Sequence, residues 1–428
     1  PDKTSYDVDI NSIKGITIAE INWDERIDHD KPIEPDTLAK AIPHDQHIIL
    51  LPSFQKLLDL IDHSREQGTP ILRLLEDRPE DALTQERYQQ QLCLPTDQLA
   101  RLIGPKLVNS VAITGSDTYL RTGSDLAVLF EAKDAKALEA ALQLRRQQIV
   151  LSAGSDLKST SGVIEGIHYN GAVSRDRTIC TYLARKDNLV VVTNSLVQLR
   201  KILNTLKGKH ASVAGLKEYT WFRQRYLQND PETSAFFLIT DATIRRWCGP
   251  LWRIAASRRT QAAAILSELQ ARRLSKKDKK SETPKWIGEI TDTPSGPQSS
   301  IFGNLAFLTP ISEMDMAKVS VSEKVSYVRF RDRYQNRWRN FFDPIGGTFS
   351  IKDNKLAADI SILPLIEGSE YNDLRQVAGD IHFDNQASNP NDKSLLSAIL
   401  SVDMKTQQMR RMGNFLSRTA PNIGTNAL

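Results

Sequence analysis

Arginine is the residue type whose spacing in this chain most clearly suggests chemistry. One group lies between residues 245 and 273, and a second lies between residues 329 and 339. A guanidinium group binds carboxylate or phosphate with two parallel hydrogen bonds, and aromatic rings can support the bound ligand. The pattern predicts a site for an anionic polysaccharide, lipid headgroup or nucleic acid at Arg245, Arg246, Arg253, Arg258, Arg259, Arg333 and Arg337.

The aromatic residues of the second group favour a different interpretation. Tyr327, Phe330 and Tyr334 follow one another at steps of three or four residues, and Trp338 and Phe341 continue the series. Such steps place the rings on one stripe of a helix, with the arginines on its flanks. The net charge of only +4 over 428 residues also gives little reason to expect nucleic acid as a partner. We therefore favour a packed stripe with charged flanks, and anion binding is the alternative.

Two histidines could begin a metal site. His44 and His47 are three residues apart and follow an acidic run that starts at Asp24. In an extended chain these two side chains point to opposite faces, and Pro43 disfavours a helix at this position. His44 and His47 are therefore weak metal candidates only, and we expect neither a metal nor another cofactor.

A short sequence, Gly-Ser-Asp, occurs at residues 115–117, 123–125 and 154–156. Glycine permits positive φ, and Ser or Asp side chains bond to local amides, so these sequences indicate turns. The chain contains no G-x-S-x-G elbow, no Walker loop and no G-x-G-x-x-G sequence. No catalytic residue is assigned, and a hydrolase acting on an envelope or extracellular polymer is the enzymatic alternative.

Cys93, Cys180 and Cys248 are too few and too far apart for a disulfide scaffold, and we expect buried free thiols.

Hydrophobic periodicity predicts the elements that must position these residues. Strands are expected at 48–51, 111–114, 126–131, 162–169, 178–184, 189–193, 235–240, 349–351 and 356–363. Helices are expected at 54–61 after the cap Ser53, and at 80–103, 134–149, 195–206, 241–274, 323–342 and 395–416. This order predicts an α+β fold of antiparallel sheets covered by helices on one face, in two or three subdomains.

The domain division follows from changes in pattern along the chain. We expect an N-terminal arm (1–42), a first α+β domain (43–209), a helical segment with a basic mobile loop at 275–300 (210–300), and a second α+β segment (301–428) that continues beyond the chain. No apolar run approaches the roughly 18 to 20 residues that a membrane span requires. The start at Pro1, without an initiator Met, indicates a chain that has lost a signal peptide or has been trimmed.

Several segments together resemble a group of large, uncharacterised bacterial envelope proteins that share a domain of unknown function. The matching sequences include IPHDQHIILLPSFQKLLDLID, VAITGSDTYLRTGSDLAVLFEAKD, NLVVVTNSLVQLRKIL, AFFLITDATIRRWCGPLWRIAASRR and RFRDRYQNRWRNFFDPIG. The resemblance implies an exported protein, periplasmic, envelope-associated or secreted, with no established activity. We therefore expect a non-enzymatic structural or interaction module whose partner is another protein or the remainder of a longer polypeptide.

Overall fold

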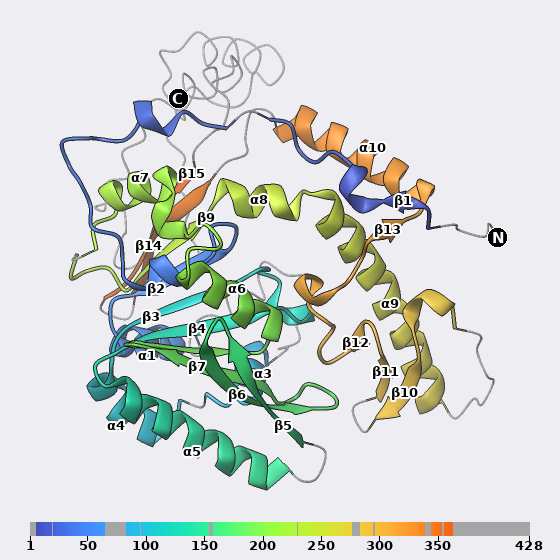
Figure 1. Ribbon diagram of the computed structural model, residues 1–428, viewed down its shortest axis with the longest axis horizontal. Coiled ribbons are helices and arrows are strands. Elements are labelled where there is room, and N and C mark those ends of the chain that lie inside the picture. The colour runs from blue at the N-terminus through green and yellow to red at the C-terminus, as the bar shows by residue number, and fades with distance from the viewer. Residues whose placement is uncertain are drawn as a thin grey trace, which may run out of the picture.

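Among the described residues, ten strands form an antiparallel sheet at the centre of the protein (Figure 1). The computed structural model describes residues 6–18, 20–64, 83–94, 96–153, 157–228, 230–275, 283–293, 296–338, 344–352 and 355–362. In spatial order the strands are β15 (Lys355–Ile362), β14 (Ile345–Lys352), β9 (Ala235–Ile239), β2 (His47–Leu51), β3 (Val108–Gly115), β4 (Leu126–Ala132), β8 (Leu189–Thr193), β7 (Cys180–Lys186), β6 (Ile167–Ser174) and β5 (Leu157–Ile164). The predicted α+β class is thus confirmed.

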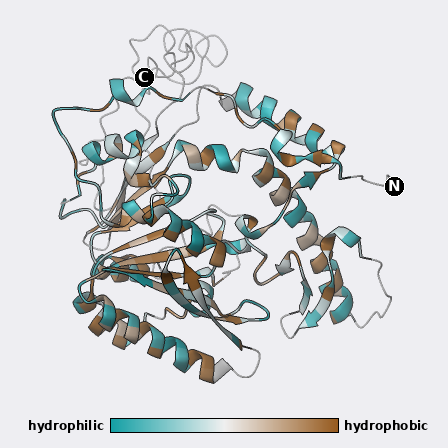
Figure 2. Cartoon of the chain, in the orientation of Figure 1, coloured by the Kyte–Doolittle hydropathy of each residue, from teal (hydrophilic) through white to brown (hydrophobic). Residues whose placement is uncertain are grey.

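Helices cover both faces of this sheet, so the expectation of helices on one face was wrong. One face packs against α1 (Phe54–His63), α3 (Thr84–Leu92), α4 (Gln98–Leu107) and α5 (Ala135–Ala153). The other face packs against η3 (Leu38–Ala41), α6 (Leu196–Leu206) and α7 (Lys217–Arg225). The reason is visible in β2, where Ile48 and Leu50 face one core while Leu51 faces the other. The central strands are accordingly mostly hydrophobic along their length (Figure 2).

Local signals in the sequence set several helix ends, and the expected cap Ser53 is one of them. Ser53 caps α1 by accepting a hydrogen bond from the Lys56 amide at 3.2 Å. Ser195 caps α6 in the same way through the Gln198 amide at 3.3 Å. Gly208, at φ +70°, follows the end of α6.

Three predicted elements are broken in the structure. The strand expected at 162–169 is divided between the end of β5 and the start of β6 by a tight turn, because Glu165 and Gly166 both adopt positive φ. The helix expected at 80–103 ends at Leu92 and resumes at Gln98, since Cys93 is left-handed. The helix expected at 241–274 consists of α8 (Asp241–Trp247) and α9 (Pro250–Leu274), separated by the Gly249-Pro250 step.

A second layer lies beside the sheet and is organised by α9 (Figure 1). One part of it contains α10 (Val321–Trp338) and the two-residue strands β1 (Val8–Asp9) and β13 (Lys318–Val319). The other part is a small sheet of β10 (Ile290–Thr293), β11 (Gly296–Ser299) and β12 (Gly303–Asn304). The expectation of an irregular loop over 275–300 was therefore wrong for β10 and β11, whose short polar strands carry no apolar period. Residues 276–282 lie outside the described part.

The ten-stranded sheet has a similar order of elements on either side of the β2–β9 pair. β2 and β9 pair antiparallel, with Ile49 opposite Phe237. Each strand leads into a helix, and each is flanked by a hairpin, β3–β4 beside β2 and β14–β15 beside β9. The sheet thus includes strands from both sides of the predicted boundaries at 209 and 300, while the division into domains stays a prediction.

Within the described residues, no helix is both long enough and apolar enough to cross a membrane. The helix predicted at 395–416 lies outside these residues. The hairpin predicted around Asp353-Asn354 is present as β14 and β15, with Lys352 opposite Lys355.

Candidate functional site

Charged side chains gather where β2 and β4 begin and where β3 and β8 end. We call this group the strand-end charge cluster. Its carboxylates are Asp45, Asp117, Asp125 and Glu313, and its cations are Arg177, Lys201, Arg246 and Arg259. Asp45 precedes β2, Asp117 and Asp125 lie in the loop that joins β3 to β4, and Glu313 is the last residue of the turn η8 (Ile311–Glu313). Among the cations, Lys201 lies on α6, Arg246 on α8, Arg259 on α9 and Arg177 in the turn between β6 and β7.

Asp45 and Arg246 connect the sheet to the second layer. Lys201 Nζ lies 2.7 Å from both carboxylate oxygens of Asp45, and Arg246 Nε lies 3.4 Å from one of them. Arg246 also donates to the backbone oxygens of Asp45 at 3.0 Å and Ser116 at 2.5 Å. Its guanidinium lies over the ring of Trp252 at 4.5 Å. The charges of Lys201 and Arg246 hold the pKa of Asp45 below its usual value, although burial acts in the opposite direction.

Arg177 and Glu313 form the closest pair of the cluster. Two hydrogen bonds of 2.5 and 3.0 Å join the guanidinium to the carboxylate, and a third of 3.1 Å goes to the Asn194 carbonyl. Both side chains are mostly buried, and the guanidinium lies 5.3 Å from the centre of the Phe307 ring. The pair therefore joins the turn between β6 and β7 to the second layer.

Arg259 reaches the loop between β3 and β4 from α9. It donates to the Gly123 carbonyl at 2.9 Å and lies 3.5 Å from a carboxylate oxygen of Asp117. Together the cluster contains four carboxylates and four cations, so its formal charges cancel when all eight are ionised. This arrangement stabilises contacts within the protein and leaves little net field to attract an external anion.

His47 and Asp125 keep unused hydrogen-bonding capacity inside the cluster. Ser116 donates to one oxygen of Asp125, while Asp125 Oδ2 and His47 Nδ1 are buried without a hydrogen-bond partner among the described residues. Burial, aided by the nearby Arg246 charge, lowers the pKa of His47 to about 4, whereas burial raises the pKa of Asp125. These two groups could exchange a proton with a ligand. Both are at most 6 % exposed, so a ligand would reach them only after the surrounding loops moved.

The lowered pKa of His47 predicts a loss of stability in acid. The unfolded chain gains a proton on this residue near pH 6.5 and the folded protein only near pH 4, so stability falls as pH decreases between these values. Replacing His47 by Gln should reduce that loss by about 3 kcal/mol, measured by urea unfolding at pH 7 and pH 4. The matched control is His168→Gln at an exposed position, and an equal change in both variants would contradict the assignment.

The structure distributes the arginines of the sequence-predicted anion site over several internal contacts. Arg246 and Arg259 belong to the cluster, and Arg245 binds Asp241 at 2.5 Å. Arg258 binds Glu323 at 2.7 Å, and Arg253 lies over the Phe330 ring at 4.2 Å.

The remaining candidates lie on α10. Arg333 is exposed and donates weakly to the Arg329 carbonyl at 3.4 Å, and the side chain of Arg337 lies outside the described part. In the aromatic stripe, Tyr327 is buried and its ring neighbours Phe330, which in turn neighbours Tyr334. Anion binding by these arginines stays a prediction.

The weak metal candidates lie close to the cluster but in different settings. His47 is the first residue of β2, and His44 lies in the preceding turn, where its amide bonds to the Ala211 carbonyl at 3.0 Å. Among the described residues, no group of three or more His, Cys, Asp or Glu side chains has a geometry that could hold a metal ion. Cys93, Cys180 and Cys248 are free and buried.

Sequence reasoning did not find the acidic half of the cluster. The Gly-Ser-Asp sequences at 115–117 and 123–125 indicate turns, and they do flank the loop between β3 and β4. Because Gly115 pairs with Leu126, the two sequences lie side by side, and Ser116 therefore reaches Asp125. Their repetition at the ends of a predicted hairpin was the available signal. The third sequence, at 154–156, lies outside the described residues.

Comparison with models of protein families, with curated proteins and with solved structures found no match to this chain.

Proposed function

We propose that this chain is a non-enzymatic structural and interaction module of an exported bacterial envelope protein, and that it assembles with a second copy through the edge of β15. The observation that carries the proposal is the exposure of this strand. Leu356 and Ile360 are 46 % and 51 % exposed, and the residues between them are exposed as well. Among the described strands, β14 is the sole partner of β15. An edge of this kind offers backbone groups to another strand.

The other half of the sheet illustrates what such an edge accepts. β15 occupies the position beside β14 that β4 occupies beside β3. The outer edge of β4 pairs antiparallel with β8, with Leu129 opposite Val191. The equivalent edge of β15 is therefore suited in geometry to an antiparallel strand.

The sequence of β15 is complementary to itself in an antiparallel arrangement. With Ala358 on a twofold axis, Leu356 of one copy lies opposite Ile360 of the other, so apolar side chains meet on one face. On the opposite face Asp359 and Ser361 accept and exchange hydrogen bonds with Tyr226 Oη at 2.8 Å, which fixes the orientation of the strand. Each copy would thus present the same ordered edge to the other.

Sedimentation velocity across a range of protein concentrations tests this proposal. We expect a monomer–dimer equilibrium in about the micromolar range, since strand pairing alone gives a small interface. Ala358→Lys places two ammonium groups opposite each other at the axis, and it should weaken dimerisation at least tenfold.

The matched control is Val163→Lys, which adds the same charge at an exposed position of β5, the opposite edge of the sheet. It should leave the equilibrium unchanged. A wild-type chain that is monomeric at every concentration, or equal weakening by both substitutions, would contradict assembly through β15. The exported location is supported by the resemblance of the matching segments to envelope proteins, and fractionation of the cells that make the protein tests it.

A further inference from the structure

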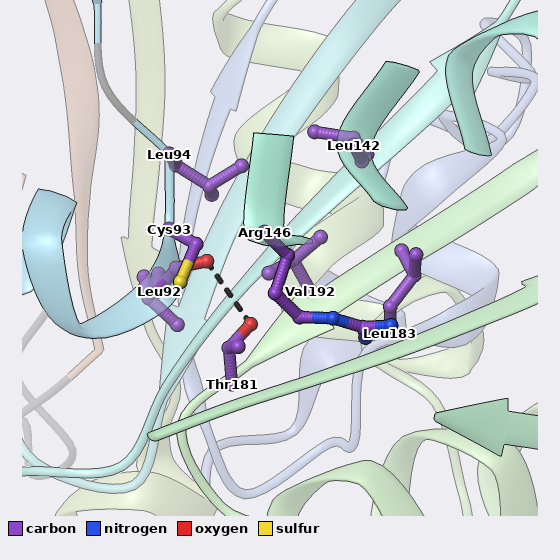
Figure 3. A pocket seen from close by; sticks show the side chains of 8 residues that line it. All are labelled: Leu92, Cys93, Leu94, Leu142, Arg146, Thr181, Leu183 and Val192. Carbon is purple, nitrogen blue, oxygen red and sulfur yellow. Dashed lines mark hydrogen bonds between the residues drawn. The ribbon is translucent and has the colours of Figure 1, made fainter. Parts of the chain in front are cut away.

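A small hollow lies between α3, α5 and the sheet (Figure 3). The apolar side chains of Leu94, Leu142, Leu183 and Val192 line it, together with the polar side chains of Arg146 and Thr181. The space accommodates about one water molecule. Thr181, which also lines the hollow, donates its hydroxyl to the Leu92 carbonyl at 3.0 Å and is therefore already satisfied.

Arg146 brings a positive charge into this hollow from α5. Figure 3 shows its side chain extending across the hollow towards Leu183. The guanidinium donates to the side-chain oxygen of Asn170, a neutral group, and it has no ion pair with any described residue. Burial lowers the pKa of Arg146, so the charge is held in a partly dehydrated place.

The carboxylates of the neighbouring elements are already used. Asp97 binds Arg145, the residue before Arg146, and Glu139 binds Arg185 at 2.6 Å. Cys93 also lines the hollow, but burial raises the pKa of its thiol to about 11, so it is neutral near pH 7. Within the described part of the chain, the charge of Arg146 therefore lacks a negative counterpart.

We propose that Arg146 and this hollow form a binding site for a small monovalent inorganic anion of the size of chloride. A guanidinium supplies N–H donors, and its partial burial beside leucine and valine side chains weakens competition from water and so strengthens its attraction for an anion. Chloride is close to a water molecule in size, so it suits the available space, whereas phosphate or an organic acid does not. The bound anion would supply the counter-charge that this partly buried cation lacks among the described residues.

Thermal unfolding of the whole chain in different sodium salts tests the site. Sodium chloride and sodium gluconate are compared at equal ionic strength, because gluconate is too large for the hollow. We expect the wild-type midpoint to be about 1–3 °C higher in chloride and to rise with chloride concentration as for a single site. Arg146→Gln should remove the difference, while Arg145→Gln, a change to the adjacent arginine that pairs with Asp97, should retain it.

Crystals of the wild-type protein grown in sodium bromide provide a second test that does not depend on a variant. Bromide scatters anomalously, and we expect a peak within hydrogen-bonding distance of the Arg146 guanidinium. The proposal is wrong if the hollow contains no bromide, or if chloride stabilises the Arg146→Gln variant as much as the wild type. If Arg146→Gln does not fold, the bromide map alone decides.

Discussion

Replacing Arg177 by methionine should destabilise the protein by about 2–4 kcal/mol, because it leaves the Glu313 carboxylate in a mostly buried place without its cation. The loss follows from the two hydrogen bonds that now join these side chains, and methionine still packs against Phe307. Urea unfolding followed by circular dichroism measures the change. A loss below about 0.5 kcal/mol would mean that the pair contributes no more than a surface ion pair.

A second substitution separates the unpaired charge from the lost packing. Glu313→Gln removes the negative charge and keeps the shape of the side chain. We expect the double variant Arg177→Met with Glu313→Gln to be at least about 1 kcal/mol more stable than Arg177→Met alone. The comparison pair is Arg101 and Asp62, which has equally short contacts but is far more exposed. Arg101→Met should have little effect, and additive losses in the double variant would contradict the role given to the charge.

A second large effect should come from Glu218, a buried carboxyl on α7. Its Oε2 accepts a hydrogen bond from the Asp241 amide at 3.2 Å, and the side chain is 4 % exposed. Burial, together with the nearby carboxylates of Asp241 and Glu20, raises the pKa of Glu218 to about 8, against the opposing effects of the Asp241 amide and Arg245. The folded protein therefore holds a proton on Glu218 at pH 7.

This proton makes stability depend on pH in a direction opposite to that of His47. The unfolded chain releases it near pH 4.5 and the folded protein near pH 8, so stability decreases as pH rises between these values. The total loss is about 4 kcal/mol. Glu218→Gln keeps an acceptor for the Asp241 amide and carries no charge. The variant should match the wild type at pH 4.5 and exceed its stability by about 4 kcal/mol at pH 8.5.

Urea unfolding at several pH values gives this difference directly. Because other groups titrate in both proteins, the quantity to compare is the gap in the free energy of unfolding between variant and wild type at each pH. Glu289→Gln, at an exposed position, is the matched control and should produce a gap that does not change with pH. A gap for Glu218→Gln that is also constant would show that the buried carboxyl does not carry the pH dependence.

Much of the fold could be predicted because its signals are local. Ser53, Ser195 and Gly208 mark helix ends through hydrogen bonds or backbone angles of their own segments. The apolar runs in β2 and β8 indicate buried strands irrespective of what covers them. These features depend on a few adjacent residues, and the sequence displays them directly.

The missed features depend on contacts between distant segments. Lys201 binds Asp45 across 156 positions of the chain, and Arg177 binds Glu313 across 136. No spacing rule relates such residues, so the charges appeared as separate solvated groups until the sheet brought them together. The small sheet of β10 to β12 was missed for a related reason, because its strands are polar and are held by packing against α9.

Amide hydrogen exchange of β15 tests the central claim, that this strand is the edge through which two copies assemble. The amides of β15 that point away from β14 should exchange slowly in concentrated protein and quickly in dilute protein, while those of β2 in the sheet centre remain protected at both concentrations. If the protection of the β15 amides does not change with protein concentration, assembly through β15 is contradicted, whether that protection is strong or weak.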